Sequence, residues 1–276
     1  MNNTSLTSTE VEIVEELMAE HGAVVTMEQI QALLSDCSPA HIRKRVSQLI
    51  RKGWLYRIKR GIYAVCDISQ RGSLPLSPYT VSQLLAQESY VSFEAALQFH
   101  GFYDQLLATV LSVTTARTKA SSVGGMEYRF ITTGEKYFYG FEIYQIDGQQ
   151  VRIAHAEKAL IDLVQYHRTT YAVDLVLEVL REYGHELDFD ILYEYLLGST
   201  TAVQRIFGFL FDLLEMEGEA ERLHALVGDQ KNSSRVTAES DLFDARWRLY
   251  INQHLQHYRD LSLEVPAAET PWTYNY

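Results

Sequence analysis

This sequence of 276 residues contains only two cysteines and no apolar run long enough to cross a membrane. The two cysteines, Cys37 and Cys66, fit neither a disulfide framework nor a zinc-site spacing, so we interpret them as reduced structural thiols. The best apolar run, Ile206–Phe211, ends at Asp212 and is far shorter than the roughly 20 residues that span a bilayer. The first ten residues lack the charged and apolar regions of a signal peptide. We therefore expect a soluble, cytoplasmic protein without a metal or other cofactor.

Positive charge is also scarce, and it is unevenly distributed. The chain has 24 Lys and Arg against 36 Asp and Glu, a formal net charge of −12. Residues 1–66 hold eight of the basic residues and seven of the acidic ones, so residues 67–276 carry a net charge of −13. All eight basic residues of the first part lie between Arg43 and Arg60, a stretch without acids. A polyanion such as DNA would be repelled by most of this protein and attracted to that one region.

The periodicity of residues 1–66 predicts three helices. The first is expected to be capped by Ser8 or Thr9 and to end at Gly22; the second is capped by Thr26, with Gln29 in the capping-box position. Ser38 caps the third, with Pro39 in its first position. Its apolar stripe of Ile42, Val46, Leu49 and Ile50 leaves the opposite face polar and basic.

A β-hairpin is predicted after Gly53. The runs Trp54–Ile58 and Ile62–Val65 are rich in aromatic and β-branched residues, and Lys59, Arg60 and Gly61 join them. Three helices followed by a hairpin with a basic tip are the plan of a winged helix-turn-helix domain. In such domains the third helix enters the major groove of DNA and the wing reaches the backbone or the minor groove.

Basic helices often are only solvated surfaces. Here the basic residues coincide with both parts that would touch DNA, which favours DNA binding. Residues expected to read bases project from the exposed face of the third helix, whereas those expected to contact phosphates flank that face or lie on the wing. The base-reading set is His41, Lys44, Ser47 and Gln48; the phosphate-binding set is Arg43, Arg45, Arg51, Arg57, Lys59 and Arg60.

The rest of the chain predicts a second, mixed domain. Residues 67–79 contain two of the five prolines and are expected to form a linker. Helices are predicted over 80–88 and 92–101, then strands, with Asp147–Gly148 as the strongest hairpin signal. A helix from 155, mainly helical sequence after 171 and a late strand at 247–252 follow. The expected fold class is α+β: a winged helix (1–66), a linker (67–79), a mixed α/β domain with a small sheet and several helices (80–258) and a tail (259–276).

An ordered set of motifs resembles the AbiEi-type antitoxins, the transcriptional regulators of AbiE (type IV) toxin–antitoxin systems. The set is "GAVVT", "SPAHIRKRVSQLIRKGWLYRIKRGIYAV", "YVSFEAALQFHG", "VTTAR", "YFYGFE", "VRIAHAEKALIDL", "AVQRIFGFL" and "RWRLYIN". One departure is Ala156, where the family often has proline. The resemblance implies a repressor that binds inverted repeats in its own promoter through the winged helix, with dimerisation on DNA as an open possibility. It also implies that the C-terminal domain helps to neutralise a nucleotidyltransferase-like toxin without forming a stable complex.

Two clusters offer an enzymatic alternative. His155, Glu157, Lys158 and Asp162 share two turns of a predicted helix, but a surface ion pair between Lys158 and Asp162 is the simpler interpretation. The Asp188–Asp190 and Gly198–Ser199 elements stand in the reverse of the order found in nucleotidyltransferases. We therefore expect no catalytic residues. A transcriptional regulator whose acidic second domain binds an effector or protein partner stays open as the first alternative, and a nuclease fused to a winged helix as the second.

Overall fold

The computed structural model describes residues 7–228 and 232–255. The chain divides into two compact units, Met1–His155 and Ala156–Tyr276, which are described separately below. This division falls inside the region 80–258, which the sequence predicts as one domain, so the limits of the predicted domains stay predictions. The predicted tail, 259–276, lies outside the described residues.

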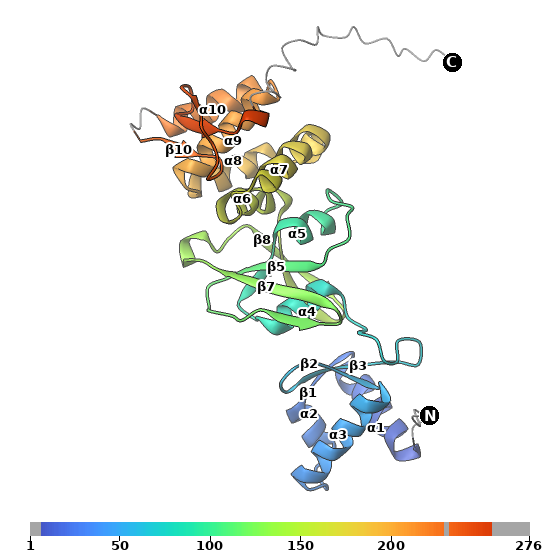
Figure 1. Ribbon diagram of the computed structural model, residues 1–276. Helices are drawn as coiled ribbons and strands as arrows, with labels where there is room; N and C mark the ends of the chain where they lie inside the picture. The colour runs from blue at the N-terminus through green and yellow to red at the C-terminus, as the bar shows by residue number, and fades with distance from the viewer. Residues whose placement is uncertain (1–6, 229–231, 256–276) are drawn as a thin grey trace, which may run out of the picture. The chain divides into compact units, whose positions relative to one another are not determined.

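The first unit begins with three helices and a small antiparallel sheet in the strand order β1-β3-β2 (Figure 1). This is the arrangement of a winged helix-turn-helix, and it confirms the predicted fold of the N-terminal region. Its elements are α1 (Ser8–His21), β1 (Val24–Thr26), α2 (Met27–Leu33), α3 (Pro39–Lys52), β2 (Leu55–Lys59) and β3 (Ile62–Val65).

A continuous apolar core holds these elements together. Each helix contributes the residues of its apolar stripe, and the hairpin contributes Trp54, Leu55, Tyr63 and Val65. Full burial of one such side chain is worth about 1.5–3 kcal/mol. The core members on the helices and β1 are Ile13, Val14, Leu17, Val25, Ile30, Ile42, Val46 and Leu49.

Hydrogen bonds at the helix starts confirm two predicted caps and correct one. The side chain of Thr26 accepts the N–H of Gln29 at 3.2 Å, and that of Ser38 accepts the N–H of His41 at 3.4 Å. The first helix is capped by Thr7, not by Ser8 or Thr9. Thr7 forms a capping box with Glu10, three residues on, so Ser8 already lies inside the helix.

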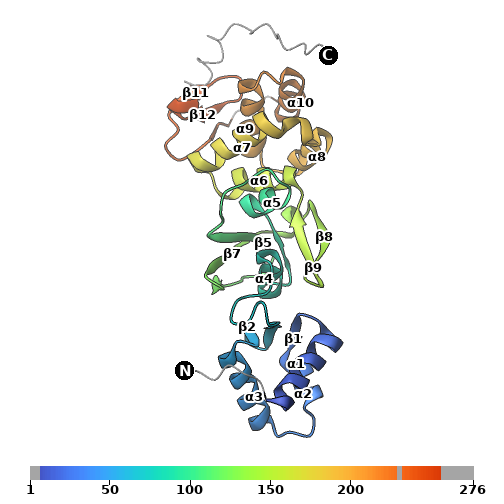
Figure 2. The ribbon, with the colours of Figure 1, turned by 90° about the vertical axis from the view of Figure 1, so that its right-hand side faces the viewer.

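A six-stranded mixed sheet forms the rest of the first unit, in the order β6-β7-β5-β4-β9-β8. Helix α4 packs against β4, β5 and β9, and α5 packs against β5 (Figures 1 and 2). The predicted turn at Asp147–Gly148 joins β8 and β9 with positive φ at both residues. The elements are α4 (Pro78–Leu85), β4 (Ser89–Val91), α5 (Phe93–Phe99), β5 (Thr109–Thr114), β6 (Ser121–Val123), β7 (Met126–Thr132), β8 (Phe141–Ile146) and β9 (Gln149–Ala154).

The second unit is mainly helical. Helix α9 is its centre: it packs against α6, α8 and α10, and most of its residues are buried. A small sheet in the order β10-β12-β11 accompanies the helices. The helices are α6 (Ala156–Tyr166), α7 (Thr170–Tyr183), α8 (Phe189–Gly198), α9 (Thr201–Leu213) and α10 (Glu217–Val227); the strands are β10 (Ser234–Arg235), β11 (Leu242–Asp244) and β12 (Leu249–Ile251).

The Lys158–Asp162 ion pair is buried, which corrects the surface pair expected from the sequence. Both side chains are at most 1% exposed, and the Lys158 ammonium donates directly to the Asp162 carboxylate. Glu157 is also buried and accepts the backbone N–H of Asp188 at 2.9 Å. The carboxylate of Asp188 in turn caps α8 by accepting two backbone N–H groups. Three carboxylates of the two candidate enzymatic clusters, those of Glu157, Asp162 and Asp188, therefore make structural contacts within the second unit.

In residues 7–228 and 232–255 the structure shows the state of the two cysteines and the character of the helices. Cys37 and Cys66 are free thiols, and burial raises the pKa of the Cys66 thiol, which disfavours the reactive thiolate. Within these ranges no helix has the length and apolar character needed to cross a membrane.

Candidate nucleic-acid interface

The two faces of α3 are separated by the burial of its apolar stripe. Ile42, Val46 and Leu49 are each no more than 3% exposed, and they fix the rotation of the helix in the domain. Gly53 ends the helix in the left-handed conformation, with φ of 80°. The residues between the stripe positions consequently face away from the core, as the 3.6-residue period requires.

The predicted base-reading residues lie on this outer face. His41, Lys44 and Ser47 are exposed, whereas Gln48 is half-buried. The Ser47 hydroxyl donates to the carbonyl of Arg43 at 2.8 Å, so it keeps only its acceptor lone pairs for a base. Lys44 can donate to the O6 and N7 acceptors of guanine in the major groove.

Most of the predicted phosphate-binding arginines are accessible. Arg43, Arg51, Arg57 and Arg60 are exposed and Arg45 is half-buried. In the described part of the chain, none of these five arginines takes part in an ion pair. Their guanidinium groups are therefore available to phosphate oxygens, which they match in geometry.

The wing tip is a tight turn held near the start of α2. Lys59 pairs with Ile62 across the hairpin, and Arg60 and Gly61 form the turn. Gly61 has φ of 83°, which glycine adopts without strain. Its carbonyl accepts the backbone N–H of Met27 at 2.8 Å. This bond fixes the basic tip relative to the helices.

Lys59 is placed differently from the arginines. Its ammonium donates to the backbone carbonyl of Leu85, at the end of α4, at a distance of 3.4 Å. The side chain is half-buried, and burial lowers the pKa of Lys59. This bond uses one of the three N–H donors of the ammonium and holds the Lys59 side chain against the end of α4.

Lys52, in the same basic stretch, has a structural role. Its Nζ lies 2.6 Å from Oε2 of Glu10, and both side chains are largely buried. Burial alone would raise the pKa of Glu10, but hydrogen bonds from Lys52 and Thr7 outweigh it and lower the pKa. The pair fastens the last turn of α3 to the first turn of α1. The sequence gives no signal for this pairing, because the two residues are far apart along the chain.

Comparisons with known proteins identify this domain. A family model described as "Transcriptional regulator, AbiEi antitoxin" matches residues 12–65, which span the winged helix from α1 to β3. The N-terminal domain belongs to the AbiEi antitoxin family of transcriptional regulators. The AbiEi match thus covers all ten residues of the predicted DNA contact sets.

A solved structure extends the likeness to nearly the whole chain. The crystal structure of the RV2827C protein from Mycobacterium tuberculosis aligns with a TM-score of 0.67 over 94% of this chain and 96% of that one. The sequences are 14% identical, so this match concerns the fold alone. No curated protein matches the sequence.

Proposed function

We propose that this chain is a cytoplasmic antitoxin and autorepressor that binds inverted repeats in its own promoter through the AbiEi winged helix. The observation that carries the proposal is the set of accessible arginines around the outer face of α3 and on the wing, in a protein of net charge −12. Base reading falls to His41, Lys44, Ser47 and Gln48 on that face. Binding of one protomer to each repeat would bring two copies together on the DNA.

The DNA-binding part of the proposal is tested with full-length protein and labelled duplexes. One duplex carries the chain's own promoter region, and a second has the same composition in scrambled order. Specific regulators typically bind their sites 10³ to 10⁷ times more tightly than nonspecific DNA. Equal affinity for the two duplexes would contradict sequence-specific repression.

The antitoxin part requires a second assay. Full-length protein, expressed from an unrelated promoter, should restore growth to cells that express a nucleotidyltransferase-like toxin encoded beside it. A version with Lys44→Ala and Arg60→Ala, which weakens DNA binding, separates repression from neutralisation. We expect that version still to rescue growth, because neutralisation is assigned to the C-terminal region. Failure of the wild-type protein to rescue would remove the antitoxin assignment and leave the DNA-binding one intact.

A polar groove in the first unit favours a second candidate, a regulator that responds to an effector or a protein partner. The groove has a volume of about 630 Å³ and is lined by glutamines together with Glu88 and Arg152. Gene neighbourhood separates the candidates: a toxin gene next to this one supports the antitoxin, and its absence supports the regulator.

We propose no catalytic activity for either candidate. A nuclease is the enzymatic alternative, and metal-dependent cleavage of nucleic acid by the pure protein tests for it. Cleavage that Glu157→Ala abolished would contradict this proposal. The burial of Glu157 and its bond to the Asp188 amide support a structural role instead.

A further inference from the structure

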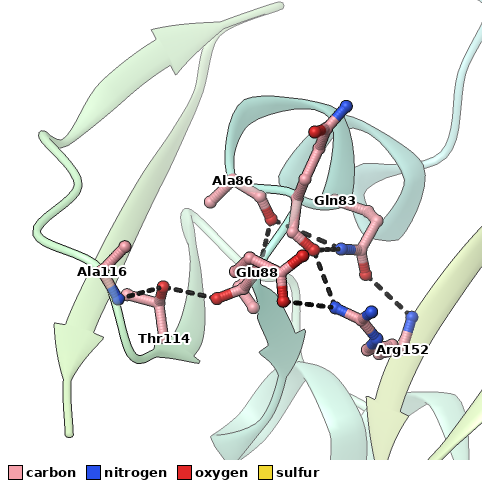
Figure 3. Close-up of polar contacts among 8 residues, drawn as sticks. Gln83, Ala86, Glu88, Thr114, Ala116 and Arg152 are labelled. Atoms are coloured by element: carbon pink, nitrogen blue, oxygen red, sulfur yellow. Dashed lines mark hydrogen bonds and ion pairs between the residues drawn. The ribbon is translucent and has the colours of Figure 1, made fainter.

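Leu85, the last residue of α4, and the three residues that lead from it to β4 form a segment that we call the Leu85–Glu88 loop. This loop is held through its backbone carbonyls. Each of its four carbonyl oxygens accepts a hydrogen bond from a side chain, and Figure 3 shows the part of this network around Gln83 and Arg152. The five donor residues lie on five different elements of the first unit: β2, α4, β4, β5 and β9. The donors are Lys59 to Leu85, Gln83 and Ser89 to Ala86, Gln83 and Arg152 to Gln87, and Thr114 to Glu88.

Arg152 and Gln83 are the central donors. Nη1 of Arg152 lies 2.8 Å from the carbonyl oxygen of Gln87 and 3.7 Å from the carboxylate of Glu88. Strand β4 pairs with β9 only at Val91 and Ile153, and the adjacent N–H, that of Arg152, donates to the side chain of Gln83 at 2.9 Å. The two side chains thus connect the loop to β9.

Arg152 is also accessible from outside the protein. It lines the polar groove, and its side chain is 29% exposed. Gln83 lines the same groove but is only 9% exposed. Arg152 is consequently the donor through which a change at the surface could reach the loop.

The other end of the network is the wing. Lys59 donates to Leu85, and the Tyr56 hydroxyl, also on β2, accepts the backbone N–H of Gly124 at 3.1 Å. Lys59 is therefore held against the Leu85 carbonyl while this network is intact, and it becomes available to a DNA phosphate only when the network loosens. A lysine ammonium held by a carbonyl keeps its charge, but it gains less from DNA than one in direct contact with a phosphate.

We propose that the Leu85–Glu88 loop is a latch that withholds Lys59 from DNA, and that Arg152 is the positioning residue that keeps the latch closed. This inference rests on the proposed DNA-binding function. Loss of the Arg152 guanidinium loosens the Gln87 and Glu88 end of the loop. Lys59 is then released from Leu85 and gains a phosphate contact.

The direction in which Arg152→Ala changes DNA affinity distinguishes the latch from a simple loss of positive charge. Removing a positive charge ordinarily weakens DNA binding. Release of Lys59 instead strengthens it, by roughly two- to fivefold for one exposed ion pair. One additional phosphate contact also steepens the slope of log affinity against log salt concentration by about 0.9.

The test measures affinity of the full-length protein for its promoter duplex by fluorescence anisotropy across a salt series. Arg152→Ala should bind the duplex more tightly than wild type and show a steeper slope of log affinity against log salt concentration. Arg152→Lys keeps a donor for the Gln87 carbonyl and should behave as wild type. Lys59→Ala should weaken binding less than Arg60→Ala does, and in the double variant of Arg152→Ala with Lys59→Ala the gain should disappear. The matched control is Arg129→Ala on β7, which removes the same charge from an exposed arginine paired with Glu127 and should show no gain.

A second variant keeps the test valid if Arg152→Ala loses its helical circular dichroism and is therefore misfolded. Gln83→Met removes two loop contacts without changing the net charge, so it should also bind the promoter duplex more tightly than wild type. The latch is contradicted if neither variant binds more tightly than Arg129→Ala, or if the gain persists without Lys59. Failure of wild-type protein to discriminate promoter from scrambled DNA would instead show that the proposed function is wrong, and the latch with it.

Discussion

Lys52 donates to Glu10 at 2.6 Å and thereby joins the end of α3 to the start of α1. This pair lies at the C-terminal end of the helix that carries the proposed reading face. Together with the buried stripe of α3, it sets how that helix is presented. Accurate placement is essential, because base contacts depend on hydrogen-bond geometry.

The pair predicts a pH dependence of local stability. Because the pKa of Glu10 is lower in the folded protein than in the unfolded chain, the carboxylate contributes to stability at pH values above its unfolded pKa, about 4.5. This contribution is lost as pH falls through the lower folded pKa. Glu10→Gln should cost about 1–3 kcal/mol at pH 7 and progressively less below pH 4.

Hydrogen exchange in α1 and α3, followed by mass spectrometry, measures this loss. Glu12→Gln, at an exposed position of α1, is the matched control and should change exchange little at either pH. Equal effects of Glu10→Gln at pH 7 and pH 3 would show that the carboxylate charge does not contribute.

Base reading and phosphate binding should respond differently to alanine substitution. Lys44→Ala should reduce discrimination at one base position by about 1–3 kcal/mol, because Lys44 projects from the outer face of α3. Arg60→Ala, on the wing, should weaken binding to all sequences by a similar factor. Affinities for a panel of single-base variants of the operator distinguish the two patterns, and identical patterns would invalidate the division into two sets.

A close contact in the second unit predicts a stability effect. A Cβ added to Gly208 on α9 would lie 2.1 Å from the Trp247 ring, whose Nε1 is fixed by a 2.6 Å hydrogen bond to Asp212. Gly208→Ala should therefore destabilise the protein by about 1–3 kcal/mol or more through overpacking. The control is Gly218→Ala on α10, where no atom lies within 4 Å of the new Cβ and a gain of roughly 0.5–1 kcal/mol is expected.

Thermal unfolding of the two glycine variants gives the comparison. A melting temperature for Gly208→Ala equal to or above that of Gly218→Ala would show that Trp247 moves aside without cost.

Local signals predicted much of the fold. Ser38 followed by Pro39 located the start of α3, and Asp147–Gly148 located the β8–β9 turn. Each of these features depends on residues adjacent in sequence, so pattern reasoning suffices. The three-residue strand β12 lies inside the strand predicted at 247–252, whereas β4, of the same length, was not predicted because its residues carry no such pattern.

The features that could not be predicted from the sequence depend on partners far away along the chain. The bond between Lys59 and Leu85 joins residues 26 positions apart, and the Lys52–Glu10 pair spans 42. Charge patterning alone placed Lys59 with the phosphate-binding arginines. The burial of Lys158 and Asp162 likewise depends on which elements cover α6, and four-residue spacing is the same in surface and buried pairs.

The salt dependence of promoter binding tests the central proposal most directly. With Lys59 held by Leu85, five arginines remain for phosphates: Arg43, Arg45, Arg51, Arg57 and Arg60. At roughly 0.9 per phosphate, log affinity against log salt concentration should fall with a slope of about −4 to −5 per protomer. A slope near zero would contradict the assignment of this surface to DNA.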